Sequence, residues 1–261
     1  MAIKCSIPVI DLEDFPAQSS KLVQAGEEWG CFRLVNHHNI LSVTLMSDMK
    51  SVVQSLQDFP PEIKCRNTGI IHGSWETINK YTKAVHELLV EISGKLADAL
   101  GISGFTIEGW PCLFRINQFN FAKETIGSSG FKIHTDSGFL AIVQDDEGVS
   151  GLEVMDKSGA FIPIDPWPGA LVVNLGDVAK AWSNGRLRTV KHRVQCKEGS
   201  SRYSIAAFLG PSNQIVEAPP ELVDDAHPRL YAPFTFEDYR NLRFSTKLND
   251  GEALNLLLID P

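Results

Sequence analysis

Three side chains in this chain, those of His134, Asp136 and His192, are of the types that bind a metal ion. His134 and Asp136 lie two residues apart in the stretch 132–136, whose alternating apolar and polar residues predict the end of a strand. Residues two apart on a strand point to the same face, so one imidazole and one carboxylate could meet one metal. His192 lies in a second alternating stretch, 190–194. Two histidines and one carboxylate leave positions open on an iron ion, a ligand set typical of non-haem Fe(II).

Arg202 and Ser204 follow ten residues after His192 and open the apolar stretch 205–209. A guanidinium fork beside a hydroxyl suits the distal carboxylate of a 2-oxo acid. The alternative is a surface pair of His134 with Asp136 and an ordinary ion pair for Arg202. That alternative needs several independent coincidences of type and spacing. The sequence therefore predicts an iron site with a carboxylate anchor beside it.

Helices are predicted before this region and strands around it. The fold class expected is α+β, mainly β, with an antiparallel sandwich or jelly roll and flanking helices. Apolar residues recur at helical spacing in four segments, 17–29, 42–57, 75–100 and 234–247. Short apolar strands are expected at 30–35, 139–144, 151–155, 170–174, 189–195 and 203–209. We expect a mainly helical N-terminal region, 1–112, to pack on a jelly-roll domain, 113–261, that ends in the last helix.

Composition excludes several classes of protein. The chain has 261 residues, of which 43% are hydrophobic, enough for one substantial core. A formal net charge of −8 and scattered basic residues argue against a nucleic-acid partner. No apolar run is long enough to span a bilayer, so no membrane partner is expected. Five cysteines without close paired spacing indicate reduced thiols, which predicts a cytoplasmic location.

Several stretches together resemble the plant-type Fe(II)/2-oxoglutarate-dependent dioxygenases, and the likeness covers most of the chain. The stretches that carry it are Ile-Pro-Val-Ile-Asp-Leu at 7–12, Trp-Gly-Cys-Phe-Arg-Leu-Val-Asn-His at 29–37, Asn-Leu-Gly-Asp at 174–177 and Trp-Ser-Asn-Gly at 182–185. Within that family, four further stretches are most similar to the dioxygenases for auxin oxidation. These are 66–68, 109–111, 134–140 and 190–198.

The resemblance implies a double-stranded β-helix with the helices packed outside. It also implies Fe(II) and 2-oxoglutarate as cofactors, O₂ as co-substrate and ascorbate as reductant. His134, Asp136 and His192 would bind the iron and be catalytic, Arg202 and Ser204 would bind 2-oxoglutarate, and Asn117 matches a further 2-oxoglutarate contact. A strand-end turn is the alternative explanation of Asn117.

The expected partner is a small-molecule substrate, a small hydrophobic acid, with indole-3-acetate favoured by the resemblance and auxin inactivation as the outcome. One alternative is hydroxylation or dealkylation of another specialised plant metabolite, such as an alkaloid, terpenoid or phenolic. Another is a catalytically impaired binding protein derived from an oxygenase. The sequence does not determine the oligomeric state.

The chain departs from the family pattern in two places. Arg66-Asn67-Thr68 and the helix predicted from Trp75 are almost adjacent, whereas the family has several tens of residues there, including strands that wall the substrate pocket. We therefore expect a pocket wall to be missing or replaced around 69–74. Phe119 stands where the family commonly has a tyrosine, and the lost hydroxyl predicts a 2-oxoglutarate affinity weaker by about 1 kcal/mol.

Some residues of reactive type are expected to be structural. His37 is predicted to pack or form hydrogen bonds, and His38 to be solvated. Asp177 fits either a turn or a supporting position beside the site. Phenylalanines 114, 119, 139 and 208 lie near the ligand-bearing strands, and alternation predicts that about half of them line the pocket.

Overall fold

The computed structural model describes residues 6–60, 62, 74–212 and 214–259. Its longer helices are α1 (Ser19–Glu28), α2 (Val43–Gln57), α4 (Trp75–Ala99), α5 (Asp177–Trp182) and α6 (Phe236–Thr246). Its strands are β1 (Val9–Asp11), β2 (Cys31–Val35), β3 (Cys112–Asn120), β4 (Ser129–His134), β5 (Leu140–Gln144), β6 (Leu152–Met155), β7 (Phe161–Pro163), β8 (Leu171–Leu175), β9 (His192–Gln195), β10 (Ser201–Leu209), β11 (Ile215–Val216) and β12 (Phe234–Thr235). Short 3₁₀ turns occupy Leu12–Asp14, Lys123–Thr125, Pro220–Leu222 and Glu252–Leu257.

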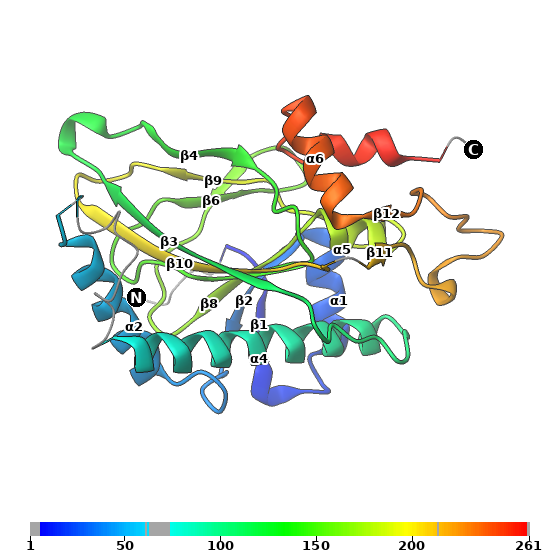
Figure 1. The fold of residues 1–261 in the computed structure, drawn as a ribbon, viewed down its shortest axis with the longest axis horizontal. Coiled ribbons are helices and arrows are strands. Elements are labelled where there is room, and N and C mark those ends of the chain that lie inside the picture. The colour runs from blue at the N-terminus through cyan, green and yellow to red at the C-terminus, as the bar shows by residue number, and fades with distance from the viewer. Residues whose placement is uncertain (1–5, 61, 63–73, 213, 260–261) are drawn as a thin grey trace.

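Two sheets face one another across the core (Figure 1). The larger has six strands in the order β1-β2-β8-β5-β10-β3, and the smaller has four in the order β4-β9-β6-β7. Pairing is antiparallel throughout both sheets except between β1 and β2, which run parallel. In the smaller sheet, β4 is an edge strand and β9 is its neighbour. Facing antiparallel sheets with helices outside confirm the α+β, mainly β class and the jelly-roll core predicted from the sequence.

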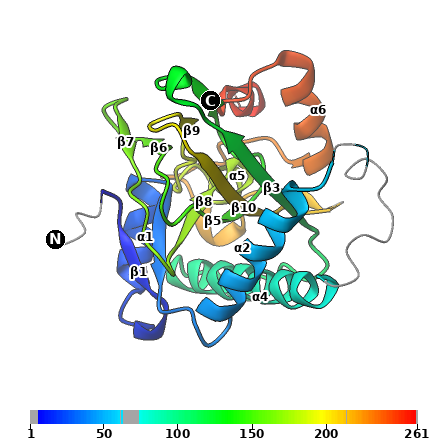
Figure 2. The same cartoon turned by 90° about the vertical axis from the view of Figure 1, so that its left-hand side faces the viewer.

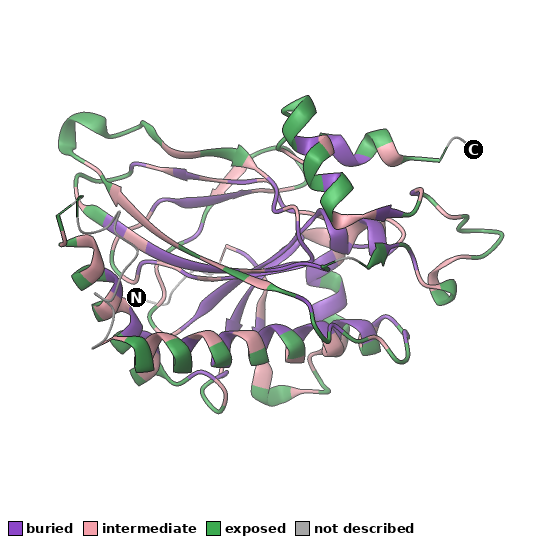
Figure 3. Ribbon diagram, viewed as in Figure 1, coloured by how far each residue is buried: buried purple, intermediate pink, exposed green. Residues whose placement is uncertain are grey.

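Three helices cover the outer face of the six-stranded sheet. The long helix α4 runs beneath it, in contact with β5 and β10, and α1 and α2 pack against α4 (Figure 2). The face of α4 turned to the sheet is buried and the opposite face is exposed (Figure 3). This arrangement follows from the apolar stripe of the helix, which must be buried against another layer.

The sequence placed most elements within a few residues. Ser42 caps α2, because its Oγ accepts a hydrogen bond from the Leu45 backbone N–H at 3.2 Å, and Thr235 caps α6 in the same way through Asp238. α4 ends at Ala99, one residue before the expected boundary. The predicted division of the chain at residue 112 stays a prediction. None of the helices in the described ranges combines the length and apolar character that crossing a bilayer requires.

One local expectation was wrong. β4 ends at His134, so Asp136 lies in the loop beyond the strand and not on its same face. The alternating sequence pattern extends to Asp136, two residues beyond the end of β4. The backbone N–H of Thr135, however, donates to Asn249 O at 3.0 Å and not to a neighbouring strand. The long-range contact with the C-terminal segment overrides the local pattern.

Candidate metal and carboxylate site

The two predicted histidine ligands lie directly opposite one another on neighbouring strands. His134 ends β4, His192 begins β9, and the register of the two strands pairs these residues. The register shifts between Phe131 and His134, an irregularity of the kind that re-aims a side chain beside a site. One ligand atom from each of His134, Asp136 and His192 lies within 4.8 Å of the others. The structure thus brings together the three residues that the sequence singled out as metal ligands.

Both imidazoles present the same nitrogen to the centre of this group. The Nδ1 atom of His134 lies 2.8 Å from the Lys132 carbonyl oxygen, and that of His192 lies 3.2 Å from the Val190 carbonyl oxygen. Each carbonyl favours a proton on Nδ1, which leaves the Nε2 lone pair free. The Nε2 atoms lie 3.9 and 3.8 Å from Oδ1 of Asp136.

Burial keeps one of these imidazoles neutral. The pKa of His134 is lowered to about 4, first because burial disfavours the charged form and second because His192 lies beside it. Neutral imidazole is the form that binds a metal. Two imidazoles and one carboxylate are donors suited to Fe(II), so the residues present fit the ion.

The carboxylate of Asp136 is held in place from the neighbouring strand and helix. Asn174 of β8 donates from Nδ2 to Asp136 Oδ2 at 3.4 Å, and the first N–H of α5, that of Asp177, donates to the Asp136 carbonyl at 2.8 Å. Gly176 permits this approach, because a Cβ there would lie 2.1 Å from the Gly138 carbonyl oxygen. From the sequence, Asp177 was given a possible supporting position, but the contact of Asn174 with Asp136 was not anticipated.

Arg202 and Ser204 lie on β10, on the same cavity as the three metal-ligand residues. Asn117 of β3 donates to Ser204 Oγ at 3.2 Å, and the two strands pair these residues directly. Asn117 is therefore in the middle of a strand, which contradicts the alternative of a strand-end turn. The cavity has a volume of about 60 Å³. Its lining residues are Arg115, Asn117, Phe119, Phe131, His134, Asp136, Val143, Leu152, His192, Val194, Arg202, Ser204, Ala206 and Phe208.

The guanidinium of Arg202 is buried and only partly engaged. Its Nη2 donates to Asp145 Oδ1, the residue after β5, while Nε and Nη1 have no hydrogen-bond partner among the described residues. The ring of Phe119 lies 5.4 Å from the guanidinium carbon. Buried donors without partners are costly unless a ligand satisfies them, so this arrangement fits a bound carboxylate such as that of 2-oxoglutarate.

The pKa of Asp145 reflects two opposed effects. Burial raises it, and the charge of Arg202 opposes that rise. Arg202 lines the 60 Å³ cavity, whereas Asp145 does not. Asp145 was not identified from the sequence, in which nothing indicates that its side chain lies beside that of Arg202.

The aromatic residues divide as alternation predicted. Phe119 and Phe208 line the cavity, whereas Phe139 is in the main core and Phe114 packs against that core. Phe131 also lines the cavity and was not anticipated; its ring centroid lies 4.6 Å from that of His134.

His37 and His38 are placed as expected. His37 is buried between the carbonyl oxygens of Leu41 and Gly169, each 3.1 Å from a ring nitrogen, and His38 is exposed. The shortened segment at 69–74 was expected to alter the pocket wall, and all of it except residue 74 lies outside the described residues. The stretch 66–68 lies outside them as well.

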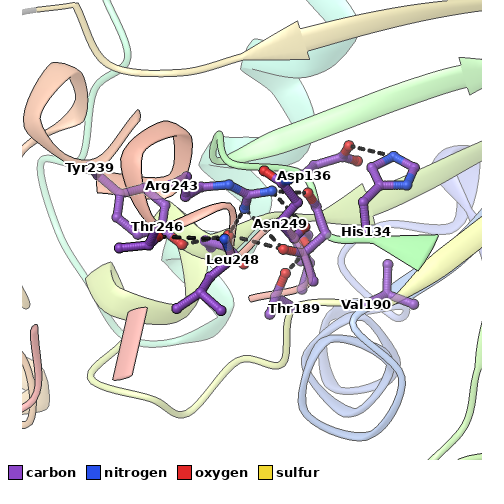
Figure 4. Close-up of polar contacts among 12 residues, drawn as sticks. His134, Asp136, Thr189, Val190, Tyr239, Arg243, Thr246, Leu248 and Asn249 are labelled. Atoms are coloured by element: carbon purple, nitrogen blue, oxygen red, sulfur yellow. Dashed lines mark hydrogen bonds and ion pairs between the residues drawn. The ribbon is translucent and has the colours of Figure 1, made fainter. Parts of the chain in front are cut away.

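Asp177 supports the site and does not form a turn. It begins α5, is fully buried, and pairs with Arg243 of α6. Tyr239 donates to its Oδ2 at 2.7 Å and Thr135 donates to the same oxygen at 3.0 Å. Figure 4 shows Arg243 reaching from α6 to the loop that carries Asp136. The structure therefore contradicts the turn given for Asp177, and these contacts favour the supporting position.

Two protein-family models match the chain. The model described as the 2OG-Fe(II) oxygenase superfamily matches residues 110–211. The model described as the N-terminal region of non-haem dioxygenases in morphine synthesis matches residues 7–98. The first of these ranges contains His134, Asp136, His192, Arg202 and Ser204.

Relatives of known name extend this match over nearly the whole chain. The 2-oxoglutarate-dependent dioxygenase DAO of rice is 41% identical over 294 aligned positions, covering 95% of this chain and 97% of the rice protein. Because 294 positions exceed the 261 residues of this chain, the rice protein contains residues that this chain lacks. Rice gibberellin 2-beta-dioxygenase 5 is 30% identical over 97% of this chain and 87% of its own length.

Solved structures agree. The crystal structure of the rice dioxygenase for auxin oxidation superposes with a TM-score of 0.91 at 41% identity, covering 97% of this chain and all of that one. The 2-oxoglutarate complex of dioxygenase for auxin oxidation 1 from Arabidopsis thaliana gives a TM-score of 0.78 at 43% identity, covering 85% of this chain and all of that one. The chain belongs to the 2OG-Fe(II) oxygenase superfamily, and it is a 2-oxoglutarate-dependent dioxygenase that uses Fe(II) and 2-oxoglutarate.

Proposed function

We propose that this dioxygenase oxidises a small hydrophobic acid, with indole-3-acetate as the favoured substrate, and so inactivates auxin. The observation that carries the proposal is the 41% identity to the rice enzyme over 95% of the chain, together with the TM-score of 0.91 to the rice dioxygenase for auxin oxidation. Gibberellin dioxygenases are related at about 30% identity and support the superfamily more than a substrate.

In this proposal, His134, Asp136 and His192 hold Fe(II). The two Nε2 atoms and Oδ1 of Asp136 face one another, while the Nδ1 contacts and Asn174 fix their orientations. Bound Fe(II) would supply the oxidation chemistry by using O₂ together with 2-oxoglutarate. Ascorbate would serve as the reductant that maintains the ferrous state.

Arg202, Ser204 and Asn117 are proposed to bind 2-oxoglutarate. The free Nε and Nη1 donors of Arg202 would meet its distal carboxylate, and the Ser204 hydroxyl would add a hydrogen bond. Asn117 would orient that hydroxyl through the 3.2 Å contact between the two side chains. The apolar lining from Phe119, Phe131 and Leu152 would exclude water from the reacting groups. The cytoplasmic location inferred from cysteine usage stays a prediction.

The test is succinate formation from 2-oxoglutarate with Fe(II), ascorbate and O₂, measured with and without indole-3-acetate. The proposal expects indole-3-acetate to stimulate succinate release and to yield an oxidised indole product by mass spectrometry. Asp136→Ala should abolish both signals, because it removes one of three metal donors. A panel of small acids, including gibberellins and phenolic acids, tests the substrate alternative in the same assay.

The outcomes separate the possibilities. Succinate release that indole-3-acetate leaves unchanged, but that another acid stimulates, would reject the auxin substrate and retain the enzyme class. Iron binding with no succinate under any condition would favour the impaired binding protein. Full activity in Asp136→Ala would reject the proposed metal site.

A further inference from the structure

The C-terminal helix and the turn after it contact residues adjacent to both histidines of the metal site. Thr135, between His134 and Asp136, is bonded through its backbone N–H to Asn249 O at 3.0 Å. Lys191, the residue before His192, pairs through Nζ with Asp250 Oδ2 at 3.1 Å. One short segment thus contacts the residue that follows β4 and the residue that precedes β9.

Arg243 of α6 adds four further hydrogen bonds around Thr135. Its Nη2 donates to the Thr135 carbonyl at 2.8 Å and to the Asn249 carbonyl at 2.7 Å, and its Nη1 donates to Thr135 Oγ1 at 3.0 Å and to Asp177 Oδ2. The backbone N–H, backbone carbonyl and hydroxyl of Thr135 are therefore all bonded to this segment or to Asp177. Figure 4 shows the Arg243 side chain extending toward Asn249 and Asp136.

Asp177 links Arg243 to the backbone of Asp136. Its side chain receives Arg243, Tyr239 and Thr135, and its backbone N–H donates to the Asp136 carbonyl at 2.8 Å. Arg243 therefore acts on two successive backbone carbonyls, directly on that of Thr135 and through Asp177 on that of Asp136. Thr135 and Asp177 are 1% and 0% exposed, so water does not compete for these bonds.

We infer that Arg243 is a positioning residue for the metal site, and that residues 239–250 form a clamp that sets the distance between Asp136 and the two histidines. This inference rests on the proposed metal site. Arg243 touches neither the proposed ligand atoms nor the cavity, so its effect would pass through the Thr135 backbone. Neighbours that orient metal ligands typically change metal affinity by 10–100-fold when they are replaced.

The test measures Co(II) binding to the metal-free protein by titration of its visible absorption, which reports ligand geometry without turnover. Arg243→Gln, which loses the charge and the two-armed reach, should weaken Co(II) binding about 10–100-fold and alter the spectrum. Arg243→Lys should recover only part of the affinity. Arg240→Gln is the matched control on the exposed face of the same helix and should bind Co(II) within about twofold of wild type.

A variant that merely loses stability is distinguished by urea unfolding in the absence of metal. If Arg243→Gln does not fold, Tyr239→Phe carries the test, since it removes a single 2.7 Å bond to Asp177. A folded Arg243→Gln, or failing that a folded Tyr239→Phe, with wild-type affinity and spectrum would overturn the inference. If wild type binds no Co(II), or if His192→Ala binds it as tightly as wild type, the proposed metal site fails instead.

Discussion

Asp145→Asn removes the negative charge beside Arg202 but keeps a carbonyl oxygen that can accept the same hydrogen bond. Arg202 is 1% exposed and its Nε and Nη1 already have no partner among the described residues. In the variant, the buried guanidinium would have no counter-ion until 2-oxoglutarate binds. The Tm of the variant should therefore depend more strongly on the 2-oxoglutarate concentration than the Tm of wild type does.

The magnitude follows from the cost of an uncompensated buried charge. Removing one partner of a buried ion pair costs about 3–5 kcal/mol, and we take about 3 kcal/mol because the asparagine oxygen remains. For a chain of this size, about 2–4 °C of Tm per kcal/mol gives a Tm lowered by about 6–12 °C without ligand. In the variant, the carboxylate of 2-oxoglutarate would pair with a guanidinium that no other carboxylate neutralises. Bound 2-oxoglutarate should therefore restore much of the lost Tm.

The assay is thermal unfolding followed by circular dichroism, with anaerobic Fe(II), across a series of 2-oxoglutarate concentrations. Wild type should gain about 2.7 kcal/mol at 100 times its Kd. A tenfold tighter Kd in the variant would add about 1.4 kcal/mol at the same concentration. The control is Glu153→Gln, which removes another buried carboxylate whose partners Arg193 and Lys197 are partly exposed.

Two results would refute this reasoning. A metal-loaded Asp145→Asn protein whose Tm without 2-oxoglutarate equals that of wild type would mean that the acid does not balance the arginine. An equal 2-oxoglutarate-dependent rise in Tm for wild type and Asp145→Asn would mean that the two carboxylates do not share the guanidinium. Glu153→Gln should show a smaller loss of Tm and no change in ligand dependence.

Phe119→Tyr should tighten 2-oxoglutarate binding about fivefold, because a hydroxyl on this cavity-lining ring adds one hydrogen bond that contributes about 1 kcal/mol. Calorimetric titration of the metal-loaded protein measures the Kd, and an unchanged or larger Kd would contradict this prediction. Burial lowers the pKa of His37 below 6.5, so below that pH the unfolded chain binds more protons and stability falls. Urea midpoints at about pH 7.5 and 5.5 should therefore differ less in His37→Gln than in wild type, and an equal pH dependence would assign the effect to other groups.

Much of the proposed site could be identified from the sequence because its residues carry strong local signals. His134, Asp136 and His192 stand out by type, and Arg202 and Ser204 by their spacing from His192. The helices were found because apolar stripes and end signals are local properties, as the Ser42 cap shows.

The parts that were missed depend on contacts between distant segments. Nothing in the spacing of Asp177, Tyr239 and Arg243 indicates that a residue of α5 meets two residues of α6 beneath Thr135. The alternation around Asp136 suggested a strand, and the C-terminal contact with Thr135 ended that strand early. Asp145 lacks a sequence signal as well, since only the fold shows that Arg202 is buried beside it.

The edge position of β4 has a consequence for the rate at which metal exchanges. An edge strand is bonded on one side only, and such strands open locally at lower free energy than the core that surrounds them. Opening β4 would separate His134 from His192 while both sheets remain otherwise folded. Metal exchange is then expected to follow the local opening of this strand, on a faster timescale than global unfolding. The bonds from Thr135 to Asn249 and Arg243 cover the end of that edge, so they would set the residence time of the ion as well as its geometry.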